Sequence, residues 1–292
     1  MRRLVLLDTD FISKTHIVRI DDNNHLIDRV LDLPECSFIC HEQTGVELRR
    51  HNSHAPEWLD EKIKSGEIEQ YTDERILKEM TGLYFNAGLY QHTALLKTAC
   101  EAFDNDYFQE HFKELGELNY TNISLSEYLS LLKCLDNRIG EGNNLGEIKE
   151  YVLLQWLNIQ NEEPVFYFCS DDKDARNGVL AVDGIKIQCI SLASAFEHLR
   201  KQGVLTTENA EPYIQAALDY YNNFKQENIH VIEASPVGRH LRVPCEQVLR
   251  EIFEGAFMEL PNGYLKYRIK LESKDNEQAN EKCTTNLLKS AK

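Results

Sequence analysis

Five short β-rich runs, separated mainly by helical patterns, constrain the fold of this chain more than any other feature of its sequence. The runs are Leu4–Leu7, Ser37–Cys40, Glu67–Tyr71, Val165–Cys169 and Ile185–Ile190. Strands that alternate with helices usually form a parallel sheet, because each crossover helix returns the chain to the same end of the sheet. We therefore expect an α/β fold with a parallel sheet covered by helices on both faces.

The helical patterns indicate a large first domain over residues 1–203, in which residues 73–140 form a helical elaboration. The expected helices are Gln43–Arg50, Asp73–Phe103, Asp106–Leu118, Ser124–Leu135, Leu145–Leu157 and Leu192–Gln202. After Gly203 the pattern changes to a mixture of helices, a strand and a hairpin signal at Asn262-Gly263. It predicts a small α+β module over residues 204–271, followed by a polar tail over residues 272–292.

Composition narrows the class of protein. The 292 residues are 42% hydrophobic, which is enough for a sizeable core, and the formal net charge is −16. That charge disfavours a protein that coats nucleic acid through bulk electrostatics, but a nuclease with an acidic metal site remains compatible with it. The apolar runs are too short for a transmembrane helix, and Asp8 ends the first run too early for a signal peptide. We expect a cytoplasmic protein with reduced cysteines.

Two acidic clusters come directly after predicted strands. Asp8-Thr9-Asp10 follows the first run, and Ser170-Asp171-Asp172-Lys173-Asp174 follows the fourth. Ligands of parallel sheets bind beyond the carboxyl ends of the strands, so the clusters would share one edge if their strands are neighbours. Carboxylate oxygens suit Mg²⁺ or Mn²⁺. The competing interpretation is helix capping by Asp8 or Asp10 and by Ser170 or Asp171, which explains one acid per cluster and leaves the others unexplained.

Two further acids have local structural explanations of their own. Glu47 follows the second run, and a pair with Arg50 three residues later on the same helix accounts for it. Glu147 lies three residues after Asn144, which is the position of the acid in a helix capping box. Taken singly, each pattern favours the structural role.

Taken in order, these segments resemble PIN-domain nucleases over about residues 1–200. The segments are LVLLDTDFI at 4–12, GVEL at 45–48, NLGEIKEY at 144–151 and CSDDKDAR at 169–176. The resemblance implies a three-layer α/β/α fold with a five-stranded, mainly parallel sheet. It also implies a metal-dependent endonuclease, usually acting on RNA. The long helical segment and the C-terminal module have no counterpart in small members of that family.

Carried over position by position, the resemblance implies a metal cluster of Asp8, Glu47, Glu147 and Asp172 that holds Mg²⁺ or Mn²⁺. Asp171 and Asp174 are alternatives for the last place, and Ser170 would orient an acid or a metal-bound water. Such an ion activates water for hydrolysis of the phosphodiester. The expected substrate-binding cations are Lys14, Arg49, Arg50, Lys173 and Arg176. RNA is the expected substrate. A protein inhibitor such as an antitoxin, or a second copy of the chain, is a further candidate partner. The sequence leaves open whether the protein acts as a toxin, in RNA processing or in defence.

Two alternatives accompany this interpretation. The first is a catalytically inert PIN-like protein that regulates or binds a partner, which the acidic surface and the extra module favour. The second is a phosphatase, since Asp8-Thr9-Asp10 resembles the Asp-x-Asp motif of the haloacid dehalogenase family. Ile12 departs from that family, which usually has Thr or Val there, and the phosphatase interpretation gives Glu47 and Glu147 no role.

Overall fold

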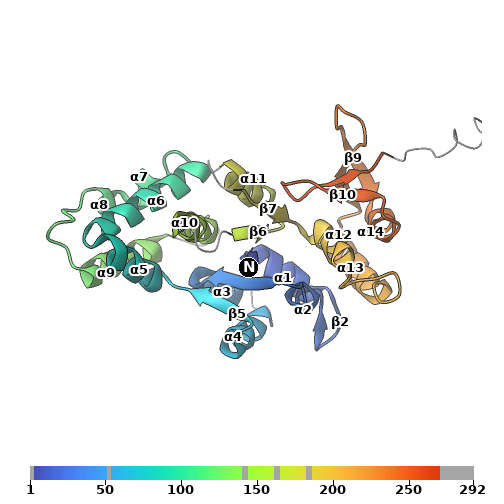
Figure 1. Cartoon of the computed structure of the whole chain (residues 1–292), viewed down its shortest axis with the longest axis horizontal. Coiled ribbons are helices and arrows are strands. Elements are labelled where there is room, and N and C mark those ends of the chain that lie inside the picture. Colours follow the sequence, from blue (N-terminus) through green and yellow to red (C-terminus); the bar gives the residue numbers. More distant parts are fainter. Residues whose placement is uncertain (1–2, 51–53, 140–143, 161–164, 182–185, 270–292) are drawn as a thin grey trace, which may run out of the picture.

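The computed structural model describes residues 3–50, 54–139, 144–160, 165–181 and 186–269, in which helices surround a five-stranded sheet (Figure 1). The strands are β1 (Arg3–Leu7), β4 (Cys36–His41), β5 (Ile68–Tyr71), β6 (Val165–Cys169) and β7 (Gln188–Ile190). Their order across the sheet is β5-β4-β1-β6-β7, and each neighbouring pair is parallel. The predicted α/β class and the five-stranded parallel sheet are therefore confirmed.

Alternate residues of the central strand β1 enter different cores. Val5 and Leu7 face a core that contains α1 (Thr9–Ile17), α2 (Leu26–Leu31), α3 (Glu42–Arg50), α4 (Ala55–Ser65) and α12 (Leu192–Lys201). Leu4 and Leu6 face the other core, which contains α5 (Asp73–Tyr84), α6 (Ala87–Phe103), α7 (Tyr107–His111), α8 (Lys113–Gly116), α9 (Leu125–Arg138), α10 (Leu145–Gln160) and α11 (Lys173–Ala181). Both faces of the sheet are thus covered, as expected for parallel strands. Across the described ranges, no helix has the length and apolar character needed to cross a membrane.

The prediction of one long helix over 73–103 is wrong. The segment forms two helices, α5 and α6, and the chain turns at Phe85, whose φ is +52°. The helices pack closely at Gly88, where an added Cβ would lie 2.7 Å from the backbone of Met80. The predicted helix over 106–118 is likewise divided into α7 and α8 at Phe112. Apolar periodicity continues through both turns, so it does not mark them.

The C-terminal module packs on the first of these cores. It consists of α13 (Glu211–Asn223), α14 (Cys245–Phe253) and a sheet of β10 (Phe257–Glu259), β11 (Leu265–Tyr267), β8 (Asn228–Ile232) and β9 (His240–Pro244), in that order. Val231 and Leu265 belong to the same buried cluster as Val5, so the core is continuous across the predicted boundary near residue 203. The expected tail over 272–292 lies outside the described residues.

The hairpin between β10 and β11 attaches the module to the edge of the main sheet. The backbone N–H of Cys189 in β7 donates to the carbonyl of Pro261 at 2.7 Å, and the Gln188 amide donates to the carbonyl of Leu260 at 2.7 Å. An edge strand exposes unpaired backbone groups, and this contact covers them on β7. It also places the module beside the carboxyl ends of β6 and β7.

Candidate metal centre

Acidic side chains from three separated segments converge at the carboxyl end of β1. Asp8 follows β1 directly and is only 3% exposed. Burial raises its pKa well above the usual range, and the negative charges of Glu147, Asp10 and Glu47 add to this effect. The structure therefore brings together three of the predicted acids, Asp8, Glu47 and Glu147.

The capping interpretation fails for Asp8. Asp8 occupies the N-cap position of α1, but its side chain makes no capping hydrogen bond. Its Oδ2 atom is buried and has no hydrogen-bond partner among the described residues. A buried carboxylate normally finds a partner, so this oxygen points to a ligand that the protein itself does not supply.

Gly146 provides the space that brings Glu47 against α10. A Cβ at position 146 would lie 2.5 Å from both carboxylate oxygens of Glu47. The Thr9 hydroxyl donates to Glu47 Oε2 at 2.9 Å and helps to hold the carboxylate there. The Gly146-Glu147 pair therefore has a physical meaning: the glycine admits one acid, and the next residue supplies another.

Glu150, which the sequence analysis missed, adds a fifth acid to the cluster of Asp8, Asp10, Glu47 and Glu147. It is 1% exposed, and its Oε1 accepts a hydrogen bond from the Thr44 hydroxyl at 3.2 Å. Its Oε2 is buried without a partner among the described residues. Burial, followed by the charges of Asp8, Glu147 and Glu47, raises its pKa well above the usual range. The available signal was its spacing of three residues from Glu147, which places both on one side of a helix.

These donors fit a hard divalent cation. The five acids offer carboxylate oxygens, two of them buried and unpartnered, and a cation relieves the repulsion between carboxylates held in a low-dielectric site. Within the described residues, however, these acids do not bring three ligand atoms within 4.8 Å of one another. That spacing suits an ion that keeps part of its water shell, as Mg²⁺ usually does.

The segment after β6 contributes to the rim of the cluster. Asp172 is exposed and caps α11, because its Oδ1 accepts the N–H groups of Asp174 and Ala175 at 2.6 and 3.1 Å. Ser170 and Asp171, the caps of the competing interpretation, do not have that role. The charge of Asp172 nevertheless raises the pKa of Glu147, so it lies near the cluster. The exposed Asp174 side chain makes no hydrogen bond or ion pair with the cluster in the described structure.

Ser170 and Asp171 stabilise the same edge. The buried Ser170 hydroxyl accepts the N–H of Asp172 at 3.1 Å, and its closeness to Asp8 opposes the rise in the pKa of that residue. Asp171 accepts the N–H of Leu192 at 3.0 Å and pairs with Lys14 at 2.8 Å. Lys14 also pairs with Asp10 at 2.8 Å, so it neutralises the rim. Burial alone would lower the pKa of Lys14, but Asp171 and Asp10 raise it above its usual value.

Of the remaining predicted substrate-binding cations, Arg176 has a structural role that the sequence did not predict. It is 5% exposed, and its guanidinium donates to the carbonyls of Ser170 at 2.8 Å and Asn262 at 2.9 Å. It therefore joins α11 to the C-terminal hairpin. It also lines a pocket of about 290 Å³ with Lys173 and Tyr264, so the expected substrate contact stays a prediction. Arg49 is exposed and pairs with Asp60 at 2.7 Å, while Arg50 and Lys173 are exposed.

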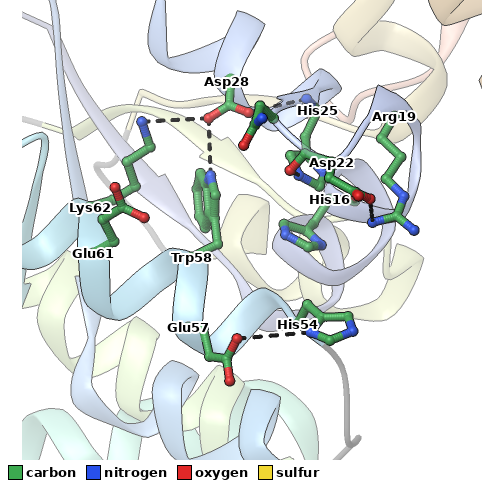
Figure 2. A pocket seen from close by; sticks show the side chains of 11 residues that line it. His16, Arg19, Asp22, His25, Asp28, His54, Glu57, Trp58, Glu61 and Lys62 are labelled. Carbon is green, nitrogen blue, oxygen red and sulfur yellow. Dashed lines mark hydrogen bonds and ion pairs between the residues drawn. The ribbon is translucent and has the colours of Figure 1, made fainter.

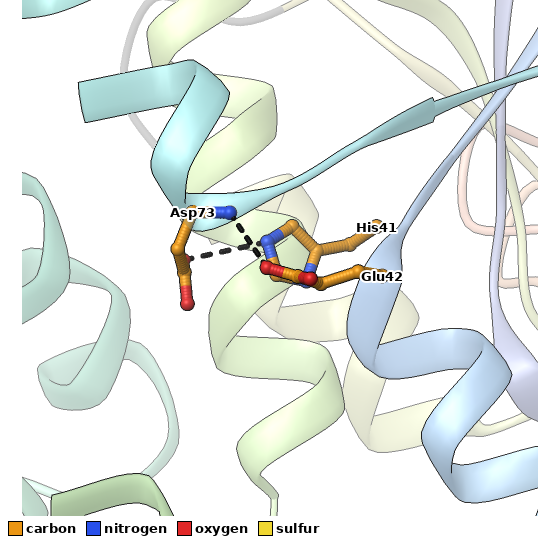
Figure 3. A group of neighbouring side chains, drawn as sticks. All are labelled: His41, Glu42 and Asp73. Atoms are coloured by element: carbon orange, nitrogen blue, oxygen red, sulfur yellow. Dashed lines mark hydrogen bonds and ion pairs between the residues drawn. The ribbon is translucent and has the colours of Figure 1, made fainter. Parts of the chain in front are cut away.

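A second polar group, His41, Glu42 and Asp73, is more compact but does not fit a cation (Figure 3). His41 Nδ1 accepts the N–H of Gln43 at 3.2 Å, which leaves the ring proton on Nε2, 3.4 Å from Asp73. A protonated nitrogen has no lone pair for a metal. Asp73 also pairs with the buried Lys149 at 2.8 Å. Burial alone would raise the pKa of Asp73, but the neighbouring Lys149 and His41 lower it. The group is a buried ion-pair network that joins β4, α5 and α10.

A pocket of about 490 Å³ lies at the other end of α1, roughly 13 Å along the helix from Asp8 (Figure 2). The rings of His16 and His25 stack there at 3.9 Å, and Trp58 donates to Asp28 at 3.0 Å. Burial and the neighbouring His25 lower the pKa of His16 to about 4. Charges of both signs line this pocket, and none of its lining residues belongs to the acidic cluster.

Glu147 should give the stability of the protein a measurable pH dependence. Burial, with the charges of Glu47 and Asp172, raises its pKa from 4.5 to about 7. Between these values the folded chain keeps a proton that the unfolded chain has released. The free energy of unfolding should therefore fall as the pH rises through this range, by about 3 kcal/mol. Urea unfolding without divalent metal measures the profile. Glu147→Gln should flatten this part of it, and identical profiles for both chains would contradict the assignment.

No family model, curated protein or solved structure matches the chain. Its function is therefore inferred from its own side chains. The strongest features are the unpartnered oxygens of Asp8 and Glu150 and the convergence of acids from β1, α3 and α10 around them.

Proposed function

We propose that this protein is a PIN-like, metal-dependent endonuclease that hydrolyses RNA phosphodiester bonds with Mg²⁺ or Mn²⁺. The observation that carries the proposal is Asp8, a buried carboxylate at a helix N-cap that makes no capping bond and keeps an unpartnered oxygen among other acids. The acids follow the order in which the sequence resembles that family. They also lie at the sheet edge where ligands of parallel α/β proteins bind.

Each side chain of the cluster has a separate task in this proposal. Asp8, Glu47 and Glu147 hold the ion, which when bound lowers the pKa of water and stabilises charge on the phosphate. Thr9 fixes Glu47 through a hydrogen bond, and Ser170 favours the charged form of Asp8. Lys14 keeps Asp10 and Asp171 at the rim, where their ion pairs reduce repulsion of an approaching phosphate. Glu150 is a further buried carboxyl group near Asp8, and its unpartnered Oε2 is available to the ion or to a water bound to it.

Cleavage of a mixed pool of single-stranded and structured RNA tests the proposal. We expect cutting in the presence of Mn²⁺ or Mg²⁺, no cutting with a chelator, and products with 5′-phosphate and 3′-hydroxyl ends. The same ions should raise the melting temperature, because they bind the folded chain alone. Absence of both cleavage and thermal stabilisation would contradict the metal centre and favour an interaction protein. A phosphorylated Asp8 trapped during turnover would favour the phosphatase instead.

A further inference from the structure

The exposed face of the C-terminal sheet has a different charge from the rest of this acidic chain. His230 pairs with Arg242 across β8 and β9, and Lys266 of β11 pairs with Ile232 of β8. Paired residues point to the same side of a sheet, so these side chains share one face with His240. The alternate residues Ile229, Val231, Val243 and Leu265 are buried on the other face. Among the strand residues described on the exposed face, none is an Asp or a Glu.

A pocket of about 290 Å³ connects this face to the acidic edge of the main sheet. Lys173, Gln226, His230 and Tyr264 line it together with Asp171. The ring of Tyr264 also contacts that of His240, at 5.5 Å between centroids, so the pocket continues onto the exposed face. Asp171 lies at its inner end and pairs with Lys14, which also pairs with Asp10 of the acidic cluster.

Three polar side chains of this pocket are available to a ligand, whereas Arg176, Ser191 and Asp171 already have partners. The Lys173 ammonium, the Gln226 amide and the His230 ring make no hydrogen bond or ion pair within the described part of the chain. Lys173 supplies a charge for a phosphate, Gln226 supplies donors and an acceptor for the edge of a base, and Tyr264 supplies an aromatic face. The volume is at the lower end of ligand pockets, about 300–1,000 Å³, and suits one unstacked nucleotide better than a base pair.

From these observations we propose that the exposed face of β8, β9 and β11 and the adjoining pocket bind a single-stranded polynucleotide and direct it to the acidic edge. A sheet that combines cations with an aromatic ring is a common platform for unpaired bases, whereas the acidic remainder of the surface repels phosphate. The inference rests on the proposed nuclease function only in taking the bound strand as the substrate. It explains how a chain of net charge −16 holds a polyanion.

Binding of a labelled single-stranded RNA to the full chain in chelator tests this surface without cleavage. The variant R242E/K266E should weaken binding at least about tenfold. The slope of the logarithm of the binding constant against the logarithm of salt concentration should also become shallower, by about 0.7 for each phosphate that the protein no longer binds. The matched control K97E/K113E changes the net charge equally on α6 and α8, which lie at the opposite end of the molecule from β9 (Figure 1). It should alter binding less than twofold, roughly the effect of bulk charge alone.

The aromatic contribution is tested separately. Tyr264→Ala should weaken single-strand binding by about tenfold, the scale of removing one base–aromatic stack, and Tyr90→Ala on the exposed side of α6 is its control. The proposed binding surface would be contradicted if the variants and their controls lost the same affinity for single-stranded RNA. Equal affinity for a duplex of the same sequence would also contradict it. If R242E/K266E cleaves RNA normally, the proposed surface is wrong but the proposed nuclease function stands. If the chain cleaves no RNA but R242E/K266E selectively loses binding, the proposed nuclease function is wrong but the proposed surface stands.

Discussion

Asp8→Asn should abolish metal-dependent cleavage and, without divalent metal, stabilise the fold at neutral pH. The variant loses a carboxylate ligand, and we expect more than about 100-fold loss of cleavage, since even outer partners of metal ligands contribute about 10- to 100-fold. Burial and three neighbouring acids make a charged Asp8 unfavourable in the folded chain. The neutral amide removes that repulsion and can donate to a neighbouring carboxylate. The rise in melting temperature caused by Mn²⁺ should disappear.

Asp174→Asn is the matched control, because Asp174 is exposed on the first turn of α11 and lies outside the acidic cluster. It makes the same chemical change, and it should keep both cleavage and the response to Mn²⁺. Melting curves with and without the ion, run beside the cleavage assay, separate metal binding from chemistry. A normal Mn²⁺ response in Asp8→Asn would show that the ion binds elsewhere. A variant that binds Mn²⁺ normally but does not cleave would place Asp8 in the reaction rather than in ligation.

Much of the main sheet was predictable because its strands are buried on both faces. Such strands are nearly continuous apolar runs, and β1 and β6 begin and end within a residue of the prediction. The first acid was predictable for the same reason, since Asp8 ends an apolar run. Whether it caps a helix was not predictable, because the capping sequence and the ligand sequence are identical. The hydrogen bonds separate them: Asp172 caps α11, and Asp8 caps nothing.

Other features depend on contacts between distant segments. The roles of Glu150 and Arg176 follow from what surrounds them, and α10 is buried on nearly every side, so its periodicity does not single out one polar face. The break at Phe85 depends on the close contact between Gly88 and Met80. Strand β9 was missed because its exposed face is polar and its buried face contributes few apolar residues. The same strand carries part of the proposed binding surface, since surfaces that bind polar ligands lack the apolar pattern that reveals a core.

Gly146→Ala should impair the metal centre without touching any ligand chemically. The new Cβ would lie 2.5 Å from both oxygens of Glu47, so the carboxylate must move away from the first turn of α10. Displacing one ligand from its position should lower Mn²⁺ affinity and cleavage by about 10- to 100-fold. Glu47→Gln should cause a similar loss, and the two changes combined should cost little more than either alone, because both disable the same side chain.

Gly82→Ala in α5 is the matched control, because no atom lies within 4 Å of its added Cβ. There the substitution should leave activity unchanged and stabilise the helix by about 0.5–1 kcal/mol, the usual preference for Ala over Gly. Titration of Mn²⁺ against melting temperature, with cleavage rates measured in parallel, compares the two variants. Full metal affinity in Gly146→Ala would mean that metal binding does not depend on the position of Glu47 against α10. Glu47 would then not be a ligand of the ion. A selective loss at position 146 would show that an alanine-sized side chain, placed on a different helix from Glu47, is enough to control the site.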